Sequence, residues 1–170
     1  APLGQVLPAF LSKPGDVDYY AVEVAGPAKI SVAADQPADM HLSILGPDGK
    51  TAIVSGGYGN KGTKISMSQD VFEPGVYYVV LRGYNASTYN MHVPYNLTIS
   101  TTPGGADRFE PNDEPSKAAR APLGQVLPAF LSKPGDVDHY AVEVAGPAKI
   151  SVAVDQPADM HLSILGPDGK

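Results

Sequence analysis

The first 50 residues of the chain recur at residues 121–170, and this repeat constrains the domain organisation more than any other feature. The two stretches align without a gap and differ only where Tyr19 is replaced by His139 and Ala34 by Val154. The 170 residues therefore hold one period of 120 residues and the first 50 residues of the next. About 120 residues suffice to bury one hydrophobic core without disulfides. The repeat predicts one unit followed by part of a second.

Apolar and polar residues alternate with a period of two along most of this unit. The alternating segments are residues 17–24, 28–35, 39–46, 63–68 and 91–100, and residues 76–82 are apolar on both faces. Period two is typical of half-buried antiparallel strands, and a segment that is apolar on both faces is typical of a central strand. Gly- and Pro-rich turn signals separate the segments, including SGGYGN at 55–60. Only residues 114–120 could form a short helical turn.

Seven or eight such strands in just over 100 residues predict an all-β fold. The expected architecture is an antiparallel β-sandwich or jelly-roll-like domain, repeated in tandem. The alternation also predicts which side chains face the core. These are Tyr20, Val22, Val24, Met40, Leu42, Ile44, Tyr95, Leu97 and Ile99.

The polar, Pro-rich stretch at 101–120 differs from the segments around it and places a unit boundary near Gly105. We therefore expect a sandwich at 1–105 that lacks its leading linker, an interdomain linker at 106–120 and the first half of a near-identical unit at 121–170. That half has four expected strands and none of the later ones. It should expose its inward side chains, namely Tyr140, Val142, Val144, Met160, Leu162 and Ile164.

Charge and composition exclude several classes of partner. The net charge is −6 and the basic residues are scattered singly, so no surface suited to nucleic acid is expected. No apolar run approaches the roughly 18 residues that cross a bilayer. The absence of cysteine excludes disulfides and thiolate metal sites. An acidic, Gly- and Pro-rich chain without cysteine suits an exported bacterial or archaeal protein, so we expect an extracellular or cell-surface location.

Several motifs occur in an order that resembles a known family. They are FEPNDEPSKA at 109–118, GDVDHY at 135–140, PADMHLSILGPDGK at 157–170, EPGVYYVVLRGYN at 73–85 and YNLTIS at 95–100. Together they resemble the bacterial pre-peptidase C-terminal domain. The resemblance implies a β-sandwich that is appended to secreted proteases and surface proteins. The collagen-binding domains of clostridial collagenases are similar to this family and bind calcium.

Clustered oxygen-bearing side chains suggest a Ca²⁺ site, since Ca²⁺ takes six to eight oxygen ligands. The candidate ligands are Glu110, Asn112 and Asp113 in the expected linker, with Asp136 and Asp138 at the start of an expected strand. The resemblance implies that these two groups meet at one site.

One departure weakens the calcium hypothesis. The calcium-binding relatives usually carry an acidic residue two positions before the first Glu, where this chain has Arg108. In the alternative interpretation Asp136 caps a turn and residues 110–113 are a solvated linker. Asp16 and Asp18 of the first copy have no linker before them, so a site there would be incomplete.

The sequence does not predict an enzyme. His41 and His161 are one position seen twice, His139 is a tyrosine in the first copy, and His92 lies on the polar face of an expected strand. None of the four histidines lies in a nucleophile or metalloprotease motif, and we expect all four to face solvent.

Two sequons and three loop tyrosines are further candidate sites. Asn85 and Asn96 begin the triplets Asn-Ala-Ser and Asn-Leu-Thr, which predict N-linked glycans in an exported protein, although such triplets are common by chance. Tyr58, Tyr84 and Tyr89 lie in or beside Gly-rich loops. They could stack on a sugar or a partner surface, or pack back over the end of the sandwich.

Two hypotheses for function remain from the sequence. In the first, the unit is a non-catalytic structural repeat of an extracellular fibre, stalk or adhesin that assembles head-to-tail with copies of itself into a filament. In the second, it is an accessory module of a secreted hydrolase that binds collagen or polysaccharide, and so glycans or extracellular matrix. Near-identical copies favour the fibre, because they suit a role in which only repetition matters.

Overall fold

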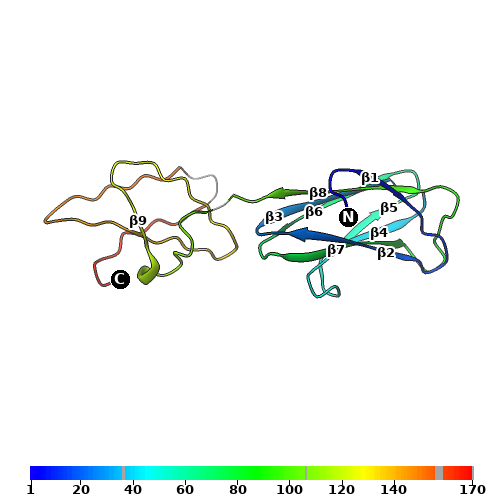
Figure 1. Cartoon of the computed structure of the whole chain (residues 1–170), viewed down its shortest axis with the longest axis horizontal. Coiled ribbons are helices and arrows are strands. Elements are labelled where there is room, and N and C mark those ends of the chain that lie inside the picture. Colours follow the sequence, from blue (N-terminus) through cyan, green and yellow to red (C-terminus); the bar gives the residue numbers. More distant parts are fainter. Residues whose placement is uncertain (36, 106, 156–158, 170) are drawn as a thin grey trace. The chain divides into compact units, whose positions relative to one another are not determined.

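The structure is a computed structural model that describes residues 1–35, 37–105, 107–155 and 159–169 (Figure 1). The chain divides into two compact units, residues 1–105 and residues 106–170. In the described residues, no helix is long and apolar enough to cross a membrane.

The first unit is a sandwich of two antiparallel four-stranded sheets, which face each other in Figure 1. Its strands are β1 (Val6–Ala9), β2 (Val17–Val24), β3 (Ala28–Asp35), β4 (Met40–Leu45), β5 (Ala52–Gly59), β6 (Lys64–Val71), β7 (Gly75–Gly83) and β8 (Tyr95–Pro103). The strand orders are β1-β8-β3-β6 and β2-β7-β4-β5. The predicted all-β sandwich is confirmed.

Every strand pair in these sheets joins an early strand to a late one. β1 pairs with β8, and β2 pairs with β7. β3 lies between β6 and β8, and β4 lies between β5 and β7. None of the first four strands pairs with another of the first four. Both sheets therefore depend on hydrogen bonds to residues 52–103.

The predicted core side chains lie between the two sheets. Eight of the nine are buried, and Tyr20 is half-buried and packs against the others. The alternation therefore identified the inward face correctly. Ile30, Ile65 and Val79 complete the same cluster from β3, β6 and β7. Burial of this apolar surface is the main favourable contribution to the stability of the unit.

A buried polar link joins the two sheets. Tyr95 on β8 is fully buried, and its hydroxyl donates a hydrogen bond to Asp18 Oδ2 on β2. The hydroxyl of Tyr20 lies 2.5 Å from that of Tyr95. Burial raises the pKa of both Asp18 and Tyr95, because each charged form loses its hydration. The link satisfies polar atoms that would be costly to bury alone.

The prediction that a strand spans 91–100 is wrong at its first four residues. Alternation over 91–100 would place Met91 and Val93 on the same face as Tyr95, yet Met91 is 57% exposed and Val93 is also exposed. Asn90 is the cause. Its Oδ1 accepts hydrogen bonds from the backbone N–H groups of the second and third residues after it, at 3.0 and 2.9 Å. This local turn competes with the sheet, so β8 begins only at Tyr95.

The turn predicted at SGGYGN (55–60) is also wrong, because its first five residues belong to β5. β5 pairs with β4, and the register shifts between Leu42 and Ser43. A Cβ atom at Gly57 would lie 3.0 Å from Leu42 Cβ, and Gly56 has a φ of 121°. The glycines therefore allow a bulge and a close approach between strands rather than ending the strand.

The second unit does not form the strands expected in 121–170. In its described residues the regular elements are the 3₁₀ helix η1 (Pro115–Lys117), β9 (Ala119–Arg120) and β10 (Tyr140–Ala141), with β9 and β10 parallel. η1 confirms the predicted short turn.

The exposure predicted for this half is found at four of the six side chains. Leu162 and Ile164 are 51% and 61% exposed, and Val144 and Met160 are also exposed. Tyr140 and Val142 are half-buried instead.

We expect Tyr95→Phe to destabilise the first unit by about 1–3 kcal/mol, because it leaves the Asp18 carboxylate half-buried without its hydroxyl donor. Urea unfolding at neutral pH measures the change. Tyr20→Phe is the matched control and should cost less, since Tyr95 still donates to Asp18. Equal losses in the two variants would contradict the assignment of Tyr95 as the donor to Asp18.

Candidate functional site

The segment that precedes the second copy is hydrogen-bonded to it. The N–H of Ala119 donates to the carbonyl of His139 at 2.9 Å, and the N–H of His139 donates to the carbonyl of Asn112 at 3.0 Å. Asp107 accepts hydrogen bonds from the N–H groups of Phe109 and Phe130, both at 2.8 Å. Residues 107–120, expected as an interdomain linker, therefore lie against residues 130–141 within the second unit.

Three of the five predicted metal ligands meet in this arrangement. One carboxylate oxygen from each of Glu110, Asp113 and Asp136 lies within 4.8 Å of the other two, and all three side chains are half-buried. The first two come from the segment before η1, and Asp136 comes from the turn before β10. Segments on both sides of the expected linker boundary thus contribute oxygens to one place.

The other two predicted ligands carry buried polar atoms that lack a hydrogen-bond partner. Asn112 has 0% exposure, and neither its Oδ1 nor its Nδ2 makes a hydrogen bond of standard geometry. Asp136 Oδ1 and Asp138 Oδ1 are likewise buried and unpaired. Each such atom costs about 1–3 kcal/mol, so buried polar atoms normally have partners. A cation bound to these oxygens would remove that cost, and an all-oxygen donor set fits Ca²⁺.

Several carboxylates lie close to one another in this cluster. Burial raises the pKa of Asp138, and the nearby carboxylates of Asp107, Asp136 and Glu110 raise it further. Burial and the charge of Asp138 raise the pKa of Tyr140 to about 12. Lys133 supplies a partial countercharge, with Nζ 3.9 Å from Asp113 Oδ2.

Two neighbouring residues explain how the cluster differs from the pattern of the resembled family. Arg108, which stands where an acid was expected, places its guanidinium 4.8 Å from the centre of the Phe109 ring. Asp107 was not singled out in the sequence. The available signal was its position next to residue 108, where an acidic residue was expected. The Asp107 carboxylate accepts a hydrogen bond from the N–H of Phe130 and adds negative charge near Asp138.

The repeat provides an internal comparison for Asp136. In both copies this aspartate accepts a hydrogen bond through Oδ2 from a backbone N–H four residues earlier, at 2.6 Å for Asp16 and 2.5 Å for Asp136. The turn-capping interpretation is therefore correct for one oxygen. Only in the second copy is the other oxygen buried beside Glu110 and Asp113.

An aromatic cluster occupies the outer face of the β2-β7-β4-β5 sheet. We call Tyr58, Tyr84 and His41 the tyrosine patch. The Tyr58 ring centre lies 4.8 Å from that of His41 and 5.8 Å from that of Tyr84, the two tyrosines meeting edge to face. The side chains of Tyr58 and Tyr84 are 62% and 59% exposed. Tyr89 is also exposed, and its ring takes part in neither of these ring contacts.

His41 is buried, so the prediction that it faces solvent is wrong. Its Nδ1 and Nε2 lie 3.3 and 3.2 Å from the hydroxyls of Ser43 and Ser55. Burial lowers the pKa of His41, and the charge of Arg82 lowers it further, so the ring is neutral at pH 7. A serine hydroxyl occupies the place where a catalytic triad has a carboxylate, so the group lacks the residue that would orient the histidine as a base.

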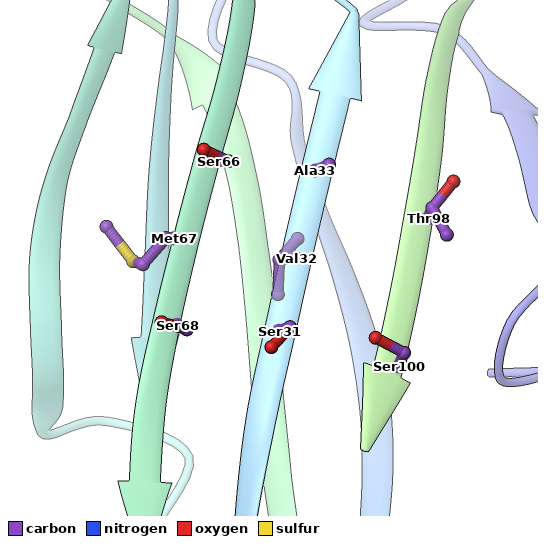
Figure 2. A pocket seen from close by; sticks show the side chains of 8 residues that line it. All are labelled: Ser31, Val32, Ala33, Ser66, Met67, Ser68, Thr98 and Ser100. Atoms are coloured by element: carbon purple, nitrogen blue, oxygen red, sulfur yellow. The ribbon is translucent and has the colours of Figure 1, made fainter. Parts of the chain in front are cut away.

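The outer face of the other sheet is lined by small side chains (Figure 2). A shallow hollow of about 390 Å³ lies over β3, β6 and β8. Its polar lining consists of the hydroxyl side chains Ser31, Ser66, Ser68, Thr98 and Ser100. Ion pairs at 3.8 Å (Lys29–Asp70) and 3.6 Å (Lys64–Asp35) border it. The described residues that line this hollow carry no titratable side chain.

The two sequon asparagines differ in accessibility. Asn85 is exposed in the loop after β7, and its Oδ1 accepts a hydrogen bond from the N–H of Ser87 at 2.9 Å. Asn96 is half-buried on the outer face of β8, with Nδ2 3.4 Å from Asp35 Oδ2. Asn85 is therefore the more accessible acceptor for a glycan.

Comparison with known proteins connects this fold to a family. Residues 16–83, which span β2 to β7, match the family model of the bacterial pre-peptidase C-terminal domain. The crystal structure of the pre-peptidase C-terminal domain of a collagenase from Bacillus anthracis is 20% identical, with a TM-score of 0.45. The match covers 58% of this chain and 90% of that one. No curated protein matches the chain. Within the first unit, residues 16–83 carry the match to the bacterial pre-peptidase C-terminal domain family.

Proposed function

We propose that this chain is a non-catalytic accessory module of a secreted bacterial protein and attaches that protein to an extracellular polymer, either collagen or polysaccharide. The family match over residues 16–83 carries the proposal. It also favours the accessory module over the fibre predicted from the repeat, because the family takes its name from a position beside a peptidase.

The tyrosine patch is the proposed binding surface. Exposed aromatic rings supply apolar contact area at low entropic cost, and their faces stack on sugars and on the rings and methylenes of a peptide chain. Tyr58 lies against His41, a neutral ring held by two serine hydroxyls. The patch is therefore supported from beneath by a fixed ring, which reduces the cost of ordering Tyr58 on binding.

We expect Tyr58→Ala and Tyr84→Ala each to weaken binding to insoluble collagen or to an insoluble polysaccharide roughly tenfold, about 1.4 kcal/mol. Pull-down isotherms of the chain with each polymer measure the loss. Tyr89→Ala is the control, because Tyr89 is also exposed but does not contact the patch rings. The binding polymer identifies the partner class. Failure of the unaltered chain to bind either polymer would refute the proposal.

A calcium ion is the proposed occupant of the oxygen cluster. Glu110, Asn112, Asp113, Asp136 and Asp138 would hold it. The support is the three converging carboxylates together with the buried, unpaired oxygens of Asn112, Asp136 and Asp138. The ion would supply positive charge to an acidic cluster and tie residues 110–113 to residues 136–138. Extracellular modules bind Ca²⁺ at roughly 10⁻⁴–10⁻³ M, in the range that an external medium provides.

We expect Asp136→Asn and Glu110→Gln to abolish Ca²⁺ binding, which isothermal calorimetry measures directly. Asp16→Asn is a matched control, because Asp16 caps the same turn in the first copy and is not a member of the group formed by Glu110, Asp113 and Asp136. A free Ca²⁺ concentration of 100 times Kd should stabilise the second unit by about 2.7 kcal/mol. Absence of binding heat in the unaltered chain, or an equal loss in Asp16→Asn, would disprove the site.

An exported protein in a glycosylating host would present Asn85 as the first acceptor for an N-linked glycan. The loop of Asn85 is exposed, whereas the side chain of Asn96 is half-buried and donates a hydrogen bond to Asp35. Asn85 directly follows Tyr84 in the chain. A glycan there would therefore lie beside the tyrosine patch.

A further inference from the structure

Short side chains occupy the middle of the outer face of the β1-β8-β3-β6 sheet (Figure 2). The registers of β3 with β6 and β8 arrange the outward side chains in rows that run across the strands. The two middle rows are Ser68–Ser31–Ser100 and Ser66–Ala33–Thr98. These six residues line the shallow hollow described above, and all except Ala33 carry a hydroxyl. Their small size lets another surface approach this sheet closely.

An ion pair closes each end of these rows. At one end Lys29 on β3 lies opposite Asp70 on β6, with Nζ 3.8 Å from Oδ1. At the other end Asp35 on β3 lies opposite Lys64 on β6, with Nζ 3.6 Å from Oδ1. The cation is thus on β3 at the first end and on β6 at the second. The four side chains are between 46% and 82% exposed, so their charges are accessible to a partner.

We propose that this surface binds the same surface of a second copy of the chain and forms a two-fold symmetric dimer. We call the outward side chains of residues 29–35, 64–70 and 96–102 the hydroxyl face. The symmetry axis would lie in the interface and run across the strands. Each β3 would then lie over the partner's β3 with its direction reversed, and each β6 over the partner's β6. Sheets that pack face to face keep their strands within about 30° of each other, which this arrangement allows.

This axis brings opposite charges together at both ends of the hydroxyl face. Lys29 would lie over the partner's Asp35, and Asp70 would lie over the partner's Lys64. Two-fold symmetry repeats both contacts at the other end. Each end would then hold four charges that alternate in sign around a square. A network of several charges contributes more than an isolated surface ion pair.

The other face-to-face arrangement is unfavourable. A symmetry axis along the strands would place Lys29 over the partner's Lys29 and Asp35 over the partner's Asp35, because β3 lies between the other two strands of the face. Like charges in such contacts are repulsive, and charge patterns of this kind fix the register of an interface. The reversal of sign along β3 therefore selects the axis across the strands.

The middle rows are also self-complementary in the selected arrangement. Ser31 would lie over the partner's Ala33, and Ser68 over the partner's Ser66. A hydroxyl both donates and accepts hydrogen bonds, so facing hydroxyls can pair directly or through water held in the hollow. Short side chains also lose little rotamer entropy on binding. Val6 on β1 lies opposite Thr98 and is 63% exposed, which adds apolar area at the edge of the face.

The size of the face predicts a weak dimer. Four strands about 4.8 Å apart and seven residues with a rise of about 3.4 Å give a flat area of about 450 Å² per copy. The total of about 900 Å² is below the roughly 1,200–2,000 Å² that stable interfaces bury. We therefore expect reversible association with a Kd on the order of 0.1 mM.

The dimer would leave both tyrosine patches free. The hydroxyl face lies on β3, β6 and β8, whereas the tyrosine patch lies on the outer face of the opposite sheet. The two patches of a dimer would therefore face away from each other. A two-fold contact is closed and yields pairs of molecules, which distinguishes it from a head-to-tail filament. Two patches on one particle would also bind a repetitive polymer more tightly than a single patch.

Sedimentation equilibrium of the full chain tests the association. We expect a monomer–dimer equilibrium between about 10 µM and 1 mM in low salt. It should weaken as salt is added, because the charges are exposed and are screened. A chain that stays monomeric over this range would overturn the proposal.

Lys64→Glu and Asp70→Lys test the contact between the two ends of the face. Each substitution places like charges over each other twice in the dimer, so each should raise the Kd roughly tenfold or more. The double variant restores opposite charges across the interface and should associate at least as tightly as the unaltered chain. A general effect of net charge would instead move the two single variants in opposite directions. Failure of the double variant to recover would overturn the proposed arrangement.

Lys50→Glu is the matched control, since Lys50 is exposed in the turn between β4 and β5 and lies outside the hydroxyl face. It should leave the equilibrium unchanged. Loss of association in Tyr58→Ala but not in Lys64→Glu would assign the contact to the tyrosine patch and overturn the proposal. Polymer pull-downs with Lys64→Glu examine the other possible occupant. Loss of polymer binding with unchanged association would assign the hydroxyl face to the polymer and also overturn the proposal.

Discussion

The hydrogen bonding between early and late strands is the constraint on which the first unit depends. β1 to β4 carry much of the core, yet each obtains its backbone partners from β5 to β8. A β-strand without a partner leaves its N–H and C=O groups unpaired and its apolar face exposed. The first unit meets this requirement within residues 1–105. In the described part of residues 121–170 most of the corresponding apolar side chains are exposed.

Period-two alternation predicted the sandwich and its inward face, because those depend on local sequence and on burial. It failed where a side chain or a glycine altered the backbone locally. Asn90 ends the pairing before β8, and Gly57 lets β5 approach Leu42 closely. His41 was placed in solvent because alternation does not reveal that Tyr58 covers it. The structure of residues 121–170 could not be predicted from these residues alone. Residues 1–50 are nearly identical, yet they form strands β1 to β4.

The candidate metal centre shows the same dependence on partners. Asp16 and Asp136 make the same turn, but only Asp136 has Glu110 and Asp113 beside it. The sequence identified the five oxygen-bearing residues, whereas their proximity follows from the contact between residues 107–120 and residues 130–141. Asp107 was missed because its importance comes from that contact: it binds the N–H of Phe130, far along the chain, and adds to the charge near Asp138.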